Sequence, residues 1–299
     1  MVPILLKNGP NYLTYAAYPS GKDATFAAYA DACASNNITS APSLSPGLKN
    51  SDVTFGLNIA VQQGHLELVR QLLNAGAKWD ANTIIYAARS FDAVKLLVGC
   101  GYDVNTGLIG GGALLPMAVG HNNEAGIRYL LERGAKPSFG PKRNAPGHIT
   151  EWRAVMESRS ILNKAARACS PAIFALLLSY GSDLSHHDAI PLHSAAGCPP
   201  SQDGNSRIPM LEYLVDELGI DVNALDTAIE IAPDGRGQTG TPLHYAIKFG
   251  NVEIVKWLLN KGTDPDKKLP WGRSARELVN RVPPGHAICA LFAELEAKT

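Results

Sequence analysis

Histidine and cysteine are the residues of this 299-residue chain best suited to catalysis or metal binding. His186, His187 and Asp188 form the densest group of possible ligands or general bases, but adjacent side chains in a turn point in different directions. We interpret this group as a solvated turn. His193 and His244 are further candidate bases, each within a Pro-Leu-His sequence. Since no local signature supplies a nucleophile, we expect no catalytic residue.

Metal and phosphate sites have equally little support. The five cysteines are odd in number and widely spaced, without a CxxC pair: Cys33, Cys100, Cys169, Cys198 and Cys289. This spacing indicates reduced thiols rather than a disulfide framework or a zinc site. Residues 107–112, GLIGGG, lack the lysine and hydroxyl residue of a phosphate loop, so they predict a flexible turn. We expect no metal and no cofactor.

Composition restricts the classes of partner. Lysine and arginine number 27, as do aspartate and glutamate, so no overall charge favours nucleic acid or an anionic membrane. The apolar run Val2–Leu6 is interrupted at Lys7, too early for a signal peptide or a membrane-spanning segment. We therefore expect a cytoplasmic or nuclear protein that binds neither nucleic acid nor membrane.

The stretch 241–266, TPLHYAIKFGNVEIVKWLLNKGTDPD, predicts a pair of short helices. Thr241 suits a helix N-cap, Pro242 the first helical position, and Gly250 interrupts the helix after about two turns. A second helix follows and ends at Gly262, with one apolar face: Val252, Ile254, Val255, Leu258 and Leu259. Two helices this short cannot bury their apolar faces alone, so we expect similar pairs stacked on either side.

This stretch resembles an ankyrin repeat through its TPLH sequence, its glycine turn, its IVxxLL segment and its G-x-D ending. More degenerate copies occupy residues 55–78, 82–105, 113–137, 161–184 and 190–223, giving about six repeats. The resemblance implies an all-α solenoid of stacked helix-turn-helix units. It also implies that the imidazoles of His193 and His244 connect neighbouring repeats by hydrogen bonds, instead of acting as bases.

The intervals between repeat-ending glycines are irregular, which predicts loop insertions. From Gly76 to Gly101 the interval is short, indicating a lost turn, whereas residues 138–159, 199–209 and 225–240 are added. Residues 149–158 could form an extra helix carrying Trp152. We divide the chain into an N-terminal segment with a capping helix at 24–34 (1–54), the repeat array (55–268) and a C-terminal capping repeat (269–299), with a Ser/Pro/Asn-rich connection through Asp52.

The resemblance implies a concave face, made of fingers and inner helices, that binds partners. The two residues before each mid-repeat turn should project toward this face, and this row leans basic. Candidate partner-binding residues are Arg89, His121, Arg167, Tyr245, Lys248 and Phe249, with Trp79 and Tyr102 near finger bases. Such residues suit an acidic or aromatic-bearing segment of another protein or peptide.

Two classes of function remain open. The first is a non-catalytic scaffold or adaptor for protein–protein interaction, which is not an enzyme. The alternative is a small-molecule-binding protein or an enzyme, with a pocket made from the concave groove and roofed by the insertions at 138–159 and 225–240. An enclosed, partly apolar cavity with convergent polar groups would favour the alternative, and an open groove would favour a protein partner.

Overall fold

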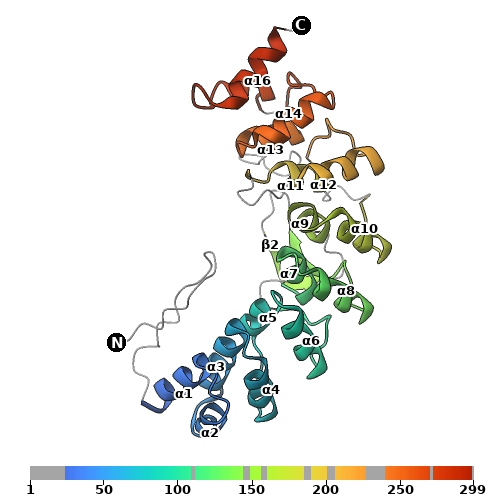
Figure 1. Cartoon of the computed structure of the whole chain (residues 1–299). Coiled ribbons are helices and arrows are strands. Elements are labelled where there is room, and N and C mark those ends of the chain that lie inside the picture. The colour runs from blue at the N-terminus through green and yellow to red at the C-terminus, as the bar shows by residue number, and fades with distance from the viewer. Residues whose placement is uncertain are drawn as a thin grey trace. The chain divides into compact units, whose positions relative to one another are not determined.

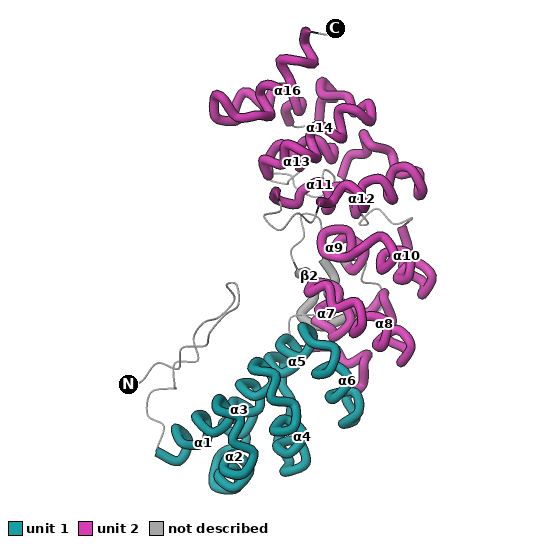
Figure 2. The backbone as a smooth tube through the Cα atoms, in the orientation of Figure 1, with its two compact units in different colours: residues 1–102 teal, residues 103–299 magenta. Residues whose placement is uncertain are grey.

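The computed structural model describes residues 24–108, 112–143, 149–155, 160–184, 190–200, 206–226, 240–269 and 272–297. Contacts divide the chain into two compact units, Met1–Tyr102 and Asp103–Thr299, which are described separately (Figure 2). Both units consist of helix pairs. We call the first helix of a pair the inner helix and the second the outer helix.

Within residues 24–102, unit 1 contains three helix pairs (Figure 1). Inner helix α3 packs against inner helices α1 and α5, and outer helix α4 packs against α2 and α6, so each kind of helix forms its own layer. The elements are α1 (Ala24–Ala34), α2 (Ser40–Leu44), the 3-10 helix η1 (Ser45–Gly47), α3 (Asn50–Gln63), α4 (Leu66–Asn74), α5 (Ala81–Ala87) and α6 (Phe91–Gly99).

Unit 2 has the same kind of internal arrangement, with five helix pairs and a two-stranded sheet in the described residues (Figure 1). Its inner helices pack in series, α7 on α9, α9 on α11, α11 on α13 and α13 on α15. The elements are α7 (Leu114–Gly120), α8 (Glu124–Glu132), β1 (Gly140–Arg143), β2 (Ile149–Val155), α9 (Ser160–Ala168), α10 (Pro171–Ser179), α11 (Pro191–Ala196), α12 (Ile208–Glu212) with the π-helical turn η2 (Tyr213–Glu217), α13 (Pro242–Lys248), α14 (Val252–Asn260), α15 (Ala275–Val279) and α16 (Ala287–Glu296).

The helix ends confirm the predicted repeat register. Gly262 adopts φ 82°, a left-handed conformation that glycine adopts without steric cost, and its N–H bonds to the carbonyl of Leu259 to close α14. The other predicted end-glycines also have positive φ: Gly76, Gly101, Gly134, Gly181 and Gly219. On α14, Ile254, Val255 and Leu258 are buried, whereas Val252 and Leu259 are partly exposed, so the core face is narrower than predicted.

The N-terminal cap is more helical than the sequence indicates. Helix α1 has the predicted bounds, and the Ser/Pro/Asn-rich connection through Asp52 contains α2, η1 and the start of α3. The side chain of Asn37 explains α2, because its Oδ1 accepts hydrogen bonds from the N–H groups of Thr39 (3.3 Å) and Ser40 (2.9 Å). These hydrogen bonds satisfy two backbone N–H groups at the start of α2 and offset the low helix propensity of its Ser and Pro residues.

The insertion after the third repeat forms strands, so the predicted extra helix at 149–158 is wrong. Strand β2 pairs antiparallel with β1, with Gly140 opposite Val155 and Arg143 opposite Ile149. β2 includes the β-branched residues Ile149, Thr150 and Val155, whose restricted χ1 angles favour extended backbone.

The lost turn between the first two predicted repeats is confirmed. Only residues 75–80 connect α4 to α5. Asp80 ends this connection as the N-cap of α5, since its side chain accepts from the N–H of Thr83 at 3.0 Å. Asn58 on α3 donates to the same carboxylate at 3.1 Å. Asp80 therefore fixes the short connection to both α5 and α3.

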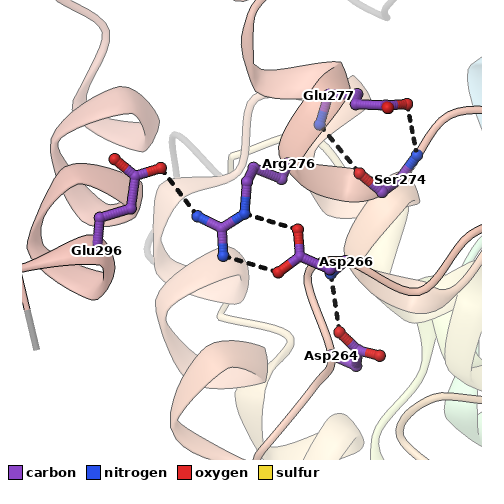
Figure 3. Close-up of polar contacts among 6 residues, drawn as sticks. All are labelled: Asp264, Asp266, Ser274, Arg276, Glu277 and Glu296. Atoms are coloured by element: carbon purple, nitrogen blue, oxygen red, sulfur yellow. Dashed lines mark hydrogen bonds and ion pairs between the residues drawn. The ribbon is translucent and has the colours of Figure 1, made fainter. Parts of the chain in front are cut away.

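An arginine joins the last two helix pairs at the C-terminal end (Figure 3). The guanidinium of Arg276 makes two hydrogen bonds to Asp266, at 2.7 and 2.9 Å, and one to Glu296 at 3.0 Å. Asp266 belongs to the turn after α14, Arg276 to α15 and Glu296 to α16. The network thus fixes the predicted C-terminal capping repeat to the repeat before it.

Replacing Leu258 by alanine should lower the free energy of unfolding by about 2–5 kcal/mol, because it leaves a cavity in the α14 core. Leu259→Ala, at a partly exposed position, should cost clearly less. Urea denaturation followed by circular dichroism measures both. An equal loss for the two variants would contradict the observed register of α14.

Replacing Arg276 by glutamine should lower the melting temperature by a modest amount, since the three side chains are 30–64% exposed. The melting temperature of Arg276→Lys should lie between those of the unmodified chain and Arg276→Gln. Lysine keeps the positive charge but lacks the planar guanidinium that binds a carboxylate through two hydrogen bonds. Raising the salt concentration to about 0.5 M should reduce the difference in melting temperature between the unmodified chain and Arg276→Gln. A salt-independent difference would show that packing, and not charge, is responsible.

Candidate partner-binding face

Four inner helices of unit 2 together carry only basic charge, whereas the fifth, α15, carries both Arg276 and Glu277. Helices α7, α9, α11 and α13 contain Lys164, Arg167 and Lys248 but no aspartate or glutamate. The outer helices of the same repeats contain Arg128 and Lys256 and six carboxylates: Glu124, Glu132, Glu212, Asp216, Glu217 and Glu253. A chain with no net charge therefore separates its charges by layer within these four repeats.

Hydrogen bonds hold the C-terminal ends of these inner helices side by side. The thiol of Cys169 donates to the carbonyl of Val119 (3.4 Å), and the thiol of Cys198 to that of Arg167 (3.7 Å). The amide of Asn251 donates to the carbonyl of Cys198 at 3.2 Å. Five predicted site residues lie at or near these ends and form what we call the inner face: His121, Arg167, Tyr245, Lys248 and Phe249.

Phe249 is the exposed aromatic residue of the inner face. It directly follows α13 and is 37% exposed, and Tyr245 lies one turn before it. A Cβ atom added to Gly197, at the end of α11, would lie 3.2 Å from Cδ1 of Tyr245 and 3.4 Å from Cε2 of Phe249. The two rings therefore rest against this glycine, and Phe249 is supported on one side while part of it faces solvent.

Tyr245 is fixed by a buried carboxylate. Its hydroxyl donates to Oδ2 of Asp226, and Oδ1 of Asp226 accepts from the N–H of Gly240 at 3.2 Å. Burial raises the pKa of the Asp226 carboxyl, against the lowering effect of these two hydrogen bonds. Burial also raises the pKa of the Tyr245 phenol, so the phenol stays a hydrogen-bond donor. Asp226 and Gly240 lie on either side of residues 227–239. The Asp226 carboxylate therefore connects the two ends of this segment to each other and to α13.

His193 and His244 connect repeats, as the Pro-Leu-His position predicts. Nε2 of His193 lies 2.9 Å from the carbonyl of Ala224, and Nε2 of His244 lies 2.9 Å from the carbonyl of Arg273. A carbonyl can only accept, so each Nε2 carries a proton. Burial lowers the pKa of His193 to about 4 and also lowers the pKa of His244. Both are neutral structural donors.

Arg207 is a residue of this region that sequence reasoning missed. Its guanidinium donates to the carbonyls of Arg167 (3.3 Å) and Cys169 (3.0 Å) at the C-terminal end of α9. A cation there complements the negative end of the helix dipole and adds positive charge beside Arg167. Its acceptors lie about 40 residues earlier in the chain, so no local sequence pattern indicates the contact.

The remaining predicted site residues belong to unit 1. Arg89 is exposed, with its guanidinium 5.6 Å from the ring centre of Tyr86. Trp79 is partly exposed and packs edge-to-face with Tyr102, with ring centres 5.7 Å apart. Tyr102, predicted to contact a partner, is only 4% exposed, because it packs under Trp79. Its role is packing.

The described residues offer little for catalysis or metal binding. They contain no group of three or more His, Cys, Asp or Glu side chains that could hold a metal ion. Burial raises the pKa of the Cys33 thiol to about 11 and that of Cys169 to about 12, which leaves both thiols poorly nucleophilic. His186, His187, Asp188 and residues 109–111 lie outside the described residues.

Two family models match the chain. One, described as ankyrin repeats in three copies, covers residues 57–140, and the other, described as ankyrin repeats in many copies, covers residues 192–259. The chain belongs to the ankyrin repeat family. Ankyrin repeats generally act as protein–protein interaction modules.

The chain is also similar to a solved structure, that of the human ASB11 ankyrin repeat domain. The identity is 21% and the TM-score 0.44, over 87% of this chain and 93% of that one. Among curated proteins there is no match. In the part of this ankyrin repeat protein that the structure describes, no helix is long and apolar enough to span a lipid bilayer.

The buried imidazole of His193 should make the protein less stable in acid. Between pH 6.5 and about 4 the unfolded chain protonates this imidazole while the folded chain does not, so the free energy of unfolding falls as the pH falls. The loss attributable to His193 is at most about 3 kcal/mol. The raised pKa of Asp226 acts in the opposite direction and reduces the net slope.

Chemical denaturation at pH 7.5 and at pH 4.5 measures this dependence. His193→Gln, whose side-chain amide can still donate to Ala224, should have a flatter pH profile than the unmodified chain. Identical profiles for the two proteins would show that His193 is not responsible.

Proposed function

We propose that this protein is a non-catalytic scaffold or adaptor whose inner face binds an acidic segment of another protein. The observation that carries the proposal is the charge of the inner helices α7, α9, α11 and α13, which include three basic residues and no carboxylate. Complementary charge attracts a partner and sets its orientation. The odd number of widely spaced cysteines supports a cytoplasmic or nuclear location.

Phe249 is the proposed anchor of this interaction. Partly exposed aromatic residues that are held rigidly often contribute most to binding, because little conformational entropy is lost on association. The ring rests against Gly197, and its neighbour Tyr245 is fixed by Asp226. Arg167 and Lys248 are exposed and lie at helix ends in the same layer. An acidic segment with an aromatic or aliphatic side chain would match this combination.

A purely structural role for Arg167 and Lys248 is the competing explanation. Both lie in the last turn of an inner helix, where a cation stabilises the helix dipole. That role predicts an effect on stability alone, whereas the proposed role predicts an effect on binding. The two explanations can therefore be separated by experiment.

The alternative of a small-molecule pocket roofed by the insertions stays a prediction. Residues 144–148, 156–159 and 227–239, which would form much of that roof, lie outside the described residues. The interaction module is the function that the described geometry supports best.

The test is affinity capture from a lysate of the source cell with three purified proteins. The first is the intact chain, and the second is the inner-face variant Arg167→Gln/Lys248→Gln/Phe249→Ala. The third is an outer-helix control, Arg128→Gln/Lys256→Gln/Tyr180→Ala, which removes the same number of charges and one exposed aromatic ring from the opposite layer of unit 2. Retained proteins are identified by mass spectrometry.

We expect a partner that the intact chain and the control retain and the inner-face variant loses. Measured with the purified partner, the inner-face substitutions should weaken binding by at least about tenfold, with melting temperatures close to that of the control. Higher salt should weaken binding by the intact chain. Equal retention by both variants would exclude the inner face as the binding site.

A further inference from the structure

Unit 1 contains an open cavity of about 600 Å³ on the side of the outer helices. Its walls come from the C-terminal ends of α4 and α6 and from the short connection after α4. The lining residues are Arg70, Leu73, Asn74, Ala77, Lys78, Trp79, Gly99 and Cys100. Its volume lies within the range of pockets that bind small molecules. It belongs to unit 1 and shares no residue with the inner face.

The apolar wall of the cavity is built on Trp79. This ring is partly exposed and is held by edge-to-face packing on the buried ring of Tyr102. The backbone beside it is also fixed, since the hydroxyl of Thr54 donates to the carbonyl of Lys78 at 3.0 Å. Leu73 and Ala77 extend the apolar surface. A planar apolar group could therefore bind against a wall that is already in place.

The charged groups of the lining are two cations, Arg70 and Lys78, and no lining residue is acidic. Arg70 forms an ion pair with Glu67, with its Nε 3.6 Å from Oε2 of the carboxylate. Both members of that pair are more than half exposed, so the pair is weak and a competing carboxylate can displace Glu67. An arginine guanidinium binds a carboxylate through two parallel hydrogen bonds, and a lysine adds a point charge.

We propose that this cavity binds a small organic anion with a planar apolar body, of the class of aromatic carboxylates. Trp79 and Leu73 would contact the apolar body, and Arg70 and Lys78 would bind the carboxylate. The site is independent of the proposed protein partner, because it lies in the other unit and uses other residues.

Cys100 allows the site to be tested in the intact chain, since its thiol is free and its residue lines the cavity. The rate at which iodoacetamide alkylates Cys100 is measured by mass spectrometry, with and without millimolar indole-3-acetate as the probe. Cys289, which is also free and partly exposed, serves as an internal control in the same sample. The neutral amide of the probe, indole-3-acetamide, tests the need for the negative charge.

Indole-3-acetate should slow alkylation of Cys100 several-fold and leave Cys289 unchanged, and the amide should protect much less. In the variant Arg70→Gln/Lys78→Gln the affinity for the acid should fall about tenfold. The matched variant Arg89→Gln/Lys95→Gln removes the same two charges from unit 1 outside the cavity and should retain full protection. Circular dichroism confirms that each variant folds.

Three outcomes would overturn the proposal. One is an unchanged rate at Cys100 over the whole concentration range of the probe. Another is equal slowing at Cys100 and Cys289, which would indicate a non-specific effect. The third is protection that does not depend on charge, seen either as equal protection by the acid and the amide or as undiminished protection in the Arg70→Gln/Lys78→Gln variant, since either result would exclude recognition of an anion.

Discussion

A buried imidazole that donates to a carbonyl in the segment after its own helix pair couples that pair to the chain leading into the next one. His193 and His244 make this bond at 2.9 Å, across 31 and 29 residues of chain. Helices α11 and α13 have only six and seven residues, too few to be stable alone, so their stability comes from packing and from such bonds. Burial keeps each imidazole neutral, and a neutral imidazole can be enclosed at far lower cost than a charged one.

Stacking also determines where charge can lie. Inner helices α9, α11 and α13 of unit 2 pack against another inner helix on each side, and most of their positions hold alanine, leucine or another apolar residue. The charged residues of α7, α9, α11 and α13 are Lys164, Arg167 and Lys248, and all three are basic. The outer helices have more free surface and carry the carboxylates. A neutral chain can in this way have a basic side without losing its overall charge balance.

The parts of the fold that follow local rules could be predicted from the sequence. Gly262 and its equivalents end helices because glycine tolerates positive φ, and apolar spacing located the buried face of α14. Helix α2 was missed because its start depends on one side chain, that of Asn37. The strand at 149–155 was missed because short apolar segments do not distinguish helix from strand without their pairing partner.

The candidate site was predictable to a lesser extent, since residue position within a repeat indicates a layer but not burial. The repeat register located Arg167, Lys248 and Phe249 correctly at helix ends, whereas Tyr102 proved to be buried beneath Trp79. The contacts of Arg207 and Asp226 could not be inferred at all. Arg207 reaches back about 40 residues to cap α9, and Asp226 meets Tyr245 19 residues later, across a segment of irregular sequence.

These two residues explain how an irregular array keeps a regular face. Arg207 lies near the end of the insertion 199–209 and binds the end of α9, and Asp226 lies near the start of the insertion 225–240 and binds α13. Because the ends of an insertion are attached to inner helices, its length can vary without shifting the helix pairs. Loop closure entropy grows only slowly with length, so such insertions cost little stability. The insertions therefore leave Phe249 in place on the inner face. The residues of the insertions can vary while the stacked helix pairs that support Phe249 stay the same.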